Sequence, residues 1–153
     1  MTHVPVLLRE TIEALAIKAG GTYVDGTLGR GGHAREILMC AGTGARLVGI
    51  DRDEQALSES SERLGGVPGV NITLVHGCHG NIAKIVRDEG IDSVDGVLLD
   101  LGVSSPQLDE AERGFSFRAD GPLDMRMDRS RGETAADIVA TRSEDELDRK
   151  SVV

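Results

Sequence analysis

The sequence predicts an α/β fold in which helices cover both faces of a parallel sheet. Short apolar runs alternate with stretches of helical periodicity, which is the pattern of βαβ units. The first strand-like run, 22–25, ends in Asp25 and leads into a glycine-rich turn, 26–32, that opens a helix. Such a turn brings free backbone N–H groups and the positive end of a helix to the end of a strand. We therefore expect a binding site beyond the carboxyl ends of the strands.

The individual elements follow from periodicity and from the residues that end them. A helix is expected over 8–16, where apolar residues recur at helical spacing before Gly20 and Gly21. Asp53 is placed to cap a later helix, and Gly90 to end another. Strands are expected over 22–25, 46–51, 71–76 and 95–101, and further helices over 32–39, 54–64 and 81–89.

The pattern changes after residue 101. A polar turn is expected over 102–109, and an irregular, charge-rich loop over 113–132. Capping boxes that begin at Thr134 and Ser143 start two short helices. We divide the chain accordingly into a cofactor-binding domain over 1–108 and the beginning of a helical, substrate-recognition segment over 109–153.

The charge-rich loop contains several arginines and two phenylalanines, Phe115 and Phe117. Arginines beside aromatic residues are typical of a contact with unpaired RNA bases. As an alternative, the arginines pair with the aspartates of the same loop and the phenylalanines pack in the core. For the two phenylalanines we expect the core.

Composition limits the classes of function. The chain has 153 residues, enough for about one domain with a core. The net charge of −9 argues against non-specific nucleic-acid binding, so any RNA contact must be local. Cys40 and Cys78 stand far apart in no metal-binding motif, which fits a reducing compartment. The apolar run at 4–8 is too short for a signal peptide or a membrane span, so we expect a cytoplasmic protein without a membrane partner.

Two ligands compete for the glycine-rich turn. Residues 29–34 satisfy the dinucleotide fingerprint, and Asp51 lies about twenty residues further on, where a ribose-binding acid belongs. A dinucleotide needs a site for pyrophosphate, whereas S-adenosylmethionine carries a sulfonium and an ammonium group. Asp25, Asp51 and Asp100 all follow or end predicted strands, so three carboxylates are expected to meet at one edge of the sheet and attract a cation. This charge favours S-adenosylmethionine, although a single such acid is more often a turn or helix cap.

Two histidines follow the third predicted strand. His76 and His79 have an H-x-x-H spacing, but the pattern contains no third ligand, and we expect no metal site. We expect His79 to contact an adenine ring, with an exposed loop histidine as the alternative.

Four blocks, 25–33, 49–53, 99–109 and 113–117, closely resemble the bacterial ribosomal RNA small subunit methyltransferase H family. The resemblance extends over 3–147. It implies a Rossmann-like class I methyltransferase fold with S-adenosylmethionine as the cofactor. It also implies methylation of N4 of a cytidine in small-subunit ribosomal RNA, with that RNA or the small ribosomal subunit as the partner.

The resemblance also implies the residues of the site. Asp51 is expected to bind the ribose hydroxyls, and Asp100 and Gln107 to complete the pocket. From the chemistry of methyl transfer to an amine, we also expect Asp100, or the backbone carbonyls just after it, to accept the proton of the target amine. Contact of Asp100 with the cofactor alone is the alternative. At position 79 the family prefers phenylalanine, which His79 replaces here. The expected cofactor-binding residues are Gly31, Gly32, His33, Asp51, His79, Asp100 and Gln107.

Members of this family are longer than this chain, which is expected to end inside a helical insertion. The strand at 97–101, apolar on both faces, is then expected to be an unprotected edge of the sheet. Three hypotheses remain: an RNA cytosine-N4 methyltransferase, a nicotinamide-dependent oxidoreductase, and a non-catalytic remnant that binds the cofactor weakly or not at all.

Overall fold

The computed structural model describes residues 5–148 of the chain. The chain divides into two compact units, and the boundary lies between Leu101 and Gly102. The division after residue 108 that we expect from the sequence falls instead within a helix of the second unit, α5 (Ser105–Asp109). Each unit is described by itself below. None of the helices between residues 5 and 148 has the length and apolar character that a membrane span requires.

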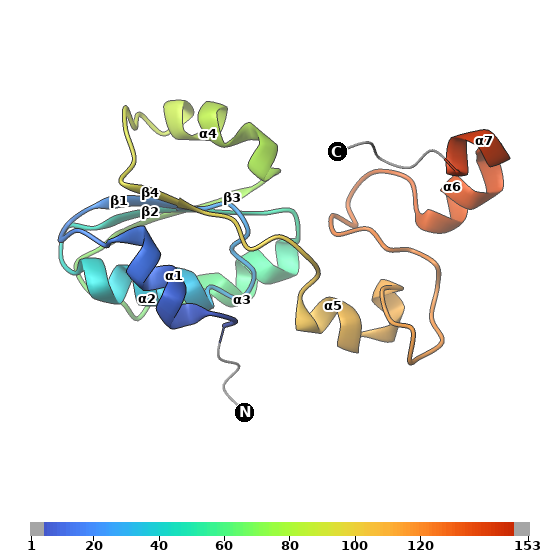
Figure 1. Cartoon of the computed structure of the whole chain (residues 1–153), viewed down its shortest axis with the longest axis horizontal. Helices are drawn as coiled ribbons and strands as arrows, with labels where there is room; N and C mark the ends of the chain where they lie inside the picture. Colours follow the sequence, from blue (N-terminus) through green and yellow to red (C-terminus); the bar gives the residue numbers. More distant parts are fainter. Residues whose placement is uncertain (1–4, 149–153) are drawn as a thin grey trace. The chain divides into compact units, whose positions relative to one another are not determined.

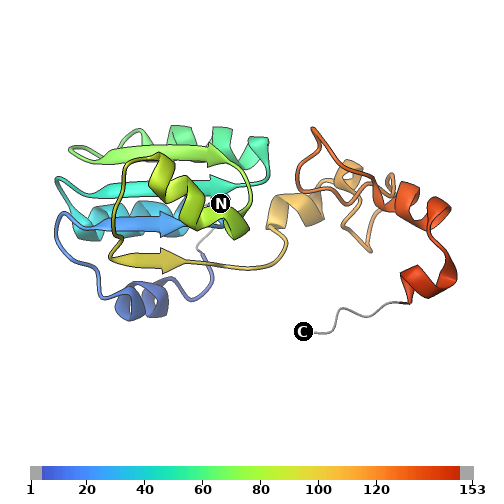
Figure 2. The same ribbon diagram turned by 90° about the horizontal axis from the view of Figure 1, so that it is seen from above.

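The first unit is built on the predicted parallel sheet, whose four strands lie in the order β3-β2-β1-β4 (Figure 2). Three of the strands have the bounds expected from the sequence. These are β1 (Thr22–Asp25), β2 (Arg46–Asp51) and β3 (Asn71–His76).

The fourth strand, β4 (Gly96–Leu98), is shorter than the expected 95–101. Its pairing ends early because β1, its neighbour in the sheet over residues 5–148, ends at Asp25, which is paired with Leu98. The chain turns at Gly26, directly after β1, and the N–H of Gly26 donates to the carbonyl oxygen of Leu98 at 2.9 Å. As expected, β4 forms an edge of the sheet, and Val97 is 43% exposed there.

Helices cover both faces of the sheet (Figure 1). On one face lie α1 (Leu8–Leu15), α2 (Gly32–Ala41) and α3 (Glu54–Leu64), and on the other lies α4 (Ile82–Asp88). The side chain of Asp53 accepts a hydrogen bond from the N–H of Gln55 at 3.1 Å, so the expected cap of α3 is confirmed.

Consecutive side chains along each strand point to opposite faces of the sheet, so they lie in two different apolar layers. Tyr23 and Leu47 lie in the layer beneath α2, and Val24 and Val48 lie in the layer beneath α4. All four side chains are at most 1% exposed. The central strands are therefore buried on both faces, which fixes the height and register of their carboxyl ends.

The expected helix over 81–89 is preceded by a short 3₁₀ turn, η1 (His79–Asn81). The turn begins at Cys78, whose Sγ accepts from the N–H of Gly80 at 3.4 Å. His79 therefore stands on a defined helical turn rather than on a free loop.

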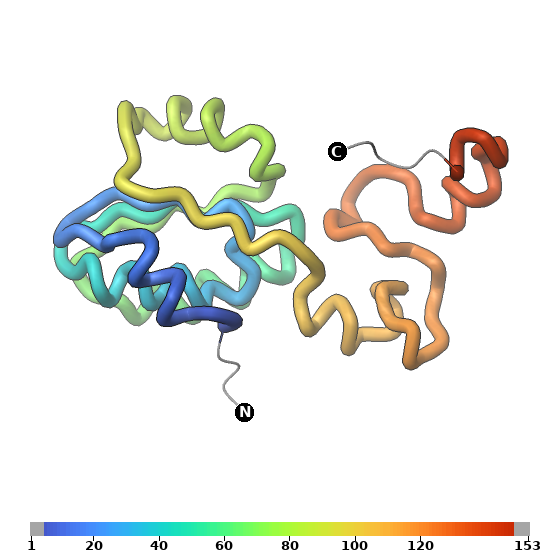
Figure 3. Tube along the Cα trace, viewed as in Figure 1, coloured from blue at the N-terminus to red at the C-terminus, as the bar shows by residue number. Residues whose placement is uncertain are grey.

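The second unit consists of short helices joined by long irregular segments, which can be followed along the trace in Figure 3. The expected polar turn over 102–109 is only partly correct, because its second half forms α5. The other elements are η2 (Ala111–Arg113), α6 (Ala135–Thr141) and α7 (Glu144–Leu147). Both expected capping boxes, at Thr134 and Ser143, are present.

Candidate functional site

The glycine-rich turn after β1 is shaped by close backbone approach and by left-handed dihedral angles. A Cβ atom on Gly26 would lie 2.6 Å from Leu99 Cδ2 and 3.2 Å from the Cβ of His79, so a larger residue would force these side chains to move. Gly29 and Gly31 have φ angles of 51° and 70°, which side chains disfavour. Gly31 is the N-cap residue of α2, so the first N–H groups of this helix begin where the turn ends.

Asp51, at the end of β2, holds the turn in place with its carboxylate. Its Oδ2 accepts from the N–H of Gly29 at 2.7 Å, and its Oδ1 accepts from the N–H of Asp53 at 2.9 Å. The carboxylate thus connects the ends of two neighbouring strands. Each of its oxygens keeps a second lone pair, so the group retains capacity to accept from hydroxyl groups of a ligand.

Asp25, at the end of β1, is only 1% exposed. Its Oδ1 accepts from the N–H of Thr27 at 3.1 Å. Burial raises the pKa of Asp25 to about 7, and the negative charges of Asp51 and Asp100 also raise it, while the bond from Thr27 lowers it. Asp25 therefore lies close enough to Asp51 and Asp100 for their charges to act on it, as the positions at the strand ends predict.

Asp100 follows β4 and is positioned through its backbone. Its N–H donates to Thr27 Oγ1 at 2.7 Å, which fixes it beside the turn, while its side chain remains 57% exposed. One carboxylate oxygen lies 3.9 Å from Nδ1 of His33. The ring of His33 is nearly buried, and its Nε2 lies 3.0 Å from the carbonyl oxygen of Val6.

The two histidines of the H-x-x-H pattern have different surroundings. His79 is half-buried and packs beside Gly26 at the end of β1. His76 instead has its Nδ1 3.4 Å from a carboxylate oxygen of Glu54 and its Nε2 3.0 Å from the carbonyl oxygen of Arg52. Within residues 5–148, no group of three or more histidine, cysteine, aspartate or glutamate side chains is arranged to hold a metal ion.

The structure thus places all but one of the expected cofactor-binding residues in the first unit, at or near the glycine-rich turn. The exception is Gln107, which lies in the second unit on α5 and is 5% exposed. Its side-chain Oε1 accepts from the N–H of Ser104 at 3.0 Å and completes the cap of α5. A structural role for Gln107 is therefore visible within its own unit.

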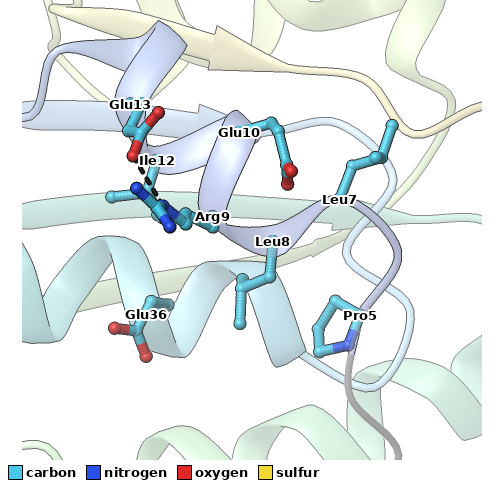
Figure 4. Close-up of a pocket in the computed structure, with 8 residues that line it drawn as sticks. All are labelled: Pro5, Leu7, Leu8, Arg9, Glu10, Ile12, Glu13 and Glu36. Atoms are coloured by element: carbon cyan, nitrogen blue, oxygen red, sulfur yellow. Dashed lines mark hydrogen bonds and ion pairs between the residues drawn. The ribbon is translucent and has the colours of Figure 1, made fainter.

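A pocket of about 660 Å³ lies elsewhere in the first unit, against α1 and α2 (Figure 4). None of the expected site residues lines it. Of the acidic residues around it, Glu13 is paired with Arg9 at 2.8 Å. The pocket therefore lacks the glycine-rich backbone and the cluster of carboxylates that mark the turn.

The arrangement at the turn suits a cationic nucleoside better than a dinucleotide. The carboxyl groups of Asp25, Asp51 and Asp100 lie around the backbone turn, with Asp25 partly protonated near pH 7, and Arg30 of the turn is paired with Glu59. A pyrophosphate brought here would meet this negative charge, whereas a sulfonium or an ammonium group would be attracted. Sequence reasoning missed two contributors, Thr27 and Val6, because each acts through one hydrogen bond to a residue distant in the chain.

Comparison with known proteins agrees with this geometry. The model of the MraW methylase family matches residues 1–150. Two relatives named ribosomal RNA small subunit methyltransferase H, from Methylobacillus flagellatus and Shewanella oneidensis, are 55% and 57% identical to this chain over the aligned residues. The first match covers 96% of this chain and 44% of the relative, and the second covers 90% and 44%. The chain therefore spans less than half the length of these relatives.

A solved structure of a protein from Clostridium thermocellum has the same fold. It superposes with a TM-score of 0.53 at 24% identity, covering 69% of this chain and 58% of that one. The Rossmann-like sheet and its helices are thus shared beyond the range of close sequence similarity. With its family model matched along nearly the whole sequence, the chain belongs to the MraW methylase family.

Proposed function

We propose that this chain is the S-adenosylmethionine-binding part of a methyltransferase that acts on N4 of a cytidine in small-subunit ribosomal RNA. The observation that carries the proposal is the meeting of Asp25, Asp51 and Asp100 around the glycine-rich turn that ends β1. The names of the relatives support ribosomal RNA as the substrate. The choice of N4 rests on the resemblance carried together by residues 25–33, 49–53, 99–109 and 113–117.

Different residues at the turn are placed to bind different parts of the cofactor. Helix α2 begins at Gly31 and Gly32, and its first free N–H groups can donate to the carboxylate of the methionine portion, with His33 beside it. Asp51 has lone pairs free to accept from the ribose hydroxyls, and His79 offers a ring beside Gly26 on which adenine can stack. The packing of His79 against Gly26, at the end of β1, supports this role.

When bound, S-adenosylmethionine supplies a methyl group on a positively charged sulfur. The exocyclic amine of cytosine is a poor nucleophile because its lone pair is delocalised into the ring. The carboxylate of Asp100 is exposed and can accept a hydrogen bond from this amine, which localises the lone pair on nitrogen. Asp100 would take the proton that the amine loses on methylation, and holding the amine in place would supply much of the remaining rate.

Calorimetry with S-adenosylmethionine and with NAD tests the cofactor assignment. We expect S-adenosylmethionine to bind and NAD not to bind. Asp51→Ala should weaken the binding of S-adenosylmethionine about tenfold or more, because it removes the ribose acceptor. Asp92→Ala is a matched control, because Asp92 is exposed and lies away from the strand ends that carry the carboxylates. Binding of NAD alone would support the oxidoreductase hypothesis, and binding of neither would support the remnant.

Transfer of a labelled methyl group tests the reaction. Unmethylated small ribosomal subunits are the substrate, and free cytidine is the negative control. Label should appear at N4 of a cytidine in the RNA, and Asp100→Ala should abolish it while S-adenosylmethionine still binds measurably. Label on another base, or on the ring carbon of cytosine, would refute the proposed specificity.

A further inference from the structure

Phe117 stands fully exposed in the charge-rich loop of the second unit. Its relative exposure is 104%, and every residue over 117–123 is exposed. The expectation that both phenylalanines of this loop pack in the core is therefore wrong for Phe117, while Phe115 is partly buried. A single exposed apolar side chain is common on protein surfaces, so the ring alone indicates no partner, but it leaves both aromatic faces free for one.

The base of this loop is firmly held. Gly114 has a φ of 76° and packs against the backbone of Pro122, and Gly121 packs against the backbone of Ala111. The N–H of Met125 donates to the carbonyl oxygen of Arg113 at 3.1 Å. These contacts join the two ends of the segment 115–120. Phe117 is thus presented on a short segment with a fixed base.

The charges of the loop leave one arginine available beside Phe117. Arg126 binds the buried carboxylate of Asp124 with its Nε at 2.8 Å and its Nη2 at 3.0 Å. Other arginines are similarly engaged, Arg129 with Asp124 and Arg131 with Asp128. Arg118, by contrast, forms no ion pair with any residue over 5–148 and is exposed. An unpaired guanidinium therefore follows an unpaired aromatic ring directly in the chain.

We propose that Phe117 and Arg118 form a contact for single-stranded RNA, in which the ring stacks on an unpaired base and the guanidinium binds a neighbouring phosphate. Aromatic side chains beside arginines bind single strands in this way, because every base has a face on which to stack. The proposal rests on the proposed function, which supplies RNA as the substrate, and it assigns the residues that hold that RNA.

The positive charge of Arg118 favours RNA as the partner at this point. The chain as a whole carries a charge of −9, which repels RNA, so an RNA contact requires a local cation such as Arg118. Beside the pair, Ser116 is polar, Ala119 is small and Asp120 is negatively charged. Leu123 and Met125 of the same loop are also exposed, so the test below includes self-association of the chain as an outcome.

Binding of a fluorescently labelled, unstructured RNA oligonucleotide to the chain, followed by anisotropy, tests this contact. Phe117→Ala should weaken binding about tenfold, and Phe117→Trp should retain it, because tryptophan also stacks. Arg118→Gln should weaken binding and reduce its dependence on salt. Leu147→Ala is the matched control, because Leu147 is an exposed apolar residue of the same unit, and it should bind as the unmodified chain does. The same RNA annealed into a duplex should bind more weakly, since its bases are already stacked.

Several outcomes would overturn the inference. RNA affinity unchanged by Phe117→Ala would place the RNA contact elsewhere and leave the proposed function intact. A chain that binds S-adenosylmethionine but no RNA would also refute the contact. Loss of self-association on Phe117→Ala, measured by sedimentation, would identify a second copy of the chain as the occupant. Failure of the proposed function is separate, since it shows as absence of S-adenosylmethionine binding by the unmodified chain.

Discussion

The Nδ1 atom of His33 faces the carboxylate of Asp100 at 3.9 Å, while its Nε2 lies 3.0 Å from the carbonyl oxygen of Val6. A carbonyl oxygen can only accept, so in the neutral ring Nε2 carries the proton and Nδ1 carries the lone pair. Two acceptors therefore face each other at a separation too long for a direct hydrogen bond. A ligand group with two N–H bonds can donate to both.

Two substitutions of His33 separate its structural contact from its ligand contact. His33→Gln places an amide N–H near the position of Nε2, retains the bond to Val6 and removes the acceptor at Nδ1. His33→Asn does the reverse, and its free energy of unfolding should fall by about 1 kcal/mol. We expect the glutamine variant to unfold close to the original chain in urea but to bind S-adenosylmethionine more weakly. Arg35→Gln, at an exposed position of the same helix, is the control. Identical behaviour of the two His33 variants would contradict this division.

Gly26→Ala tests the close packing at the end of β1. The added Cβ would lie 2.6 Å from Leu99 Cδ2 and 3.2 Å from Ile82 Cδ1, so neighbouring side chains must move. We expect a loss of about 1–3 kcal/mol in the free energy of unfolding, measured in urea. Gly66→Ala is the matched control, because nothing lies within 4 Å of a Cβ built there. Adding Leu99→Ala to Gly26→Ala should recover part of the loss, and failure to do so would place the strain elsewhere.

Most of the first unit is predictable from the sequence because its signals are local. The strands β1, β2 and β3 are largely apolar runs, and an acid or a histidine ends each one. The early end of β4 is harder to predict from the sequence, because the length of the neighbouring strand β1 sets it rather than the residues of β4. The helix α5 was missed because only five residues form it, and a capping box between Ser104 and Gln107 supports them.

The sequence predicts that the site lies at the carboxyl ends of the strands, but it does not predict which residues contact one another there. The carboxylates at 25, 51 and 100 follow from the rule that parallel strands present their carboxyl ends at one edge. The contact between Thr27 and Asp100 joins residues 73 positions apart, and that between Val6 and His33 joins residues 27 apart. Neither residue type nor spacing signals such pairs. The exposure of Phe117 was equally hidden, because hydrophobicity alone predicts burial.

The raised pKa of Asp25 predicts a stability that falls as pH rises. Its carboxyl group has a pKa of about 7 when folded, against an ordinary value of 3.8, so between these values the folded chain holds a proton that the unfolded chain has lost. The penalty for Asp25 is absent below about pH 4, grows through this window and is complete above about pH 7. Asp25→Asn should remove this dependence and raise the free energy of unfolding at pH 8 by about 4 kcal/mol at most. Urea unfolding at a series of pH values measures it, and parallel curves for both proteins would contradict it.

Binding of a cation beside Asp25 should lower this pKa again and release a proton. At pH 6, where Asp25 is mostly protonated, S-adenosylmethionine should therefore bind with net proton release. Calorimetry in buffers of different ionisation enthalpy measures the number of protons released. Asp25→Asn should abolish the release, whereas the exposed-site control Asp92→Asn should retain it. Equal binding heats in all buffers would show that the cation does not reach Asp25.

Asp124 should hold together the base of the loop that presents Phe117. Its carboxylate is nearly buried and binds Arg126, and this hydrogen bond lowers the pKa of Asp124 to about 2. The folded pKa lies below the ordinary value of 3.8, so this stabilisation is present above that value and is lost as pH falls towards 2. Asp124→Asn removes the charge that both Arg126 and Arg129 contact, so trypsin should cleave after the loop arginines several times faster at neutral pH. Asp120→Asn is the matched control, because Asp120 is exposed in the same loop, and its cleavage rate should match that of the original chain. If both variants resist trypsin equally, the glycine contacts at 114 and 121 hold the loop without the ion pair, and the presentation of Phe117 depends on backbone packing alone.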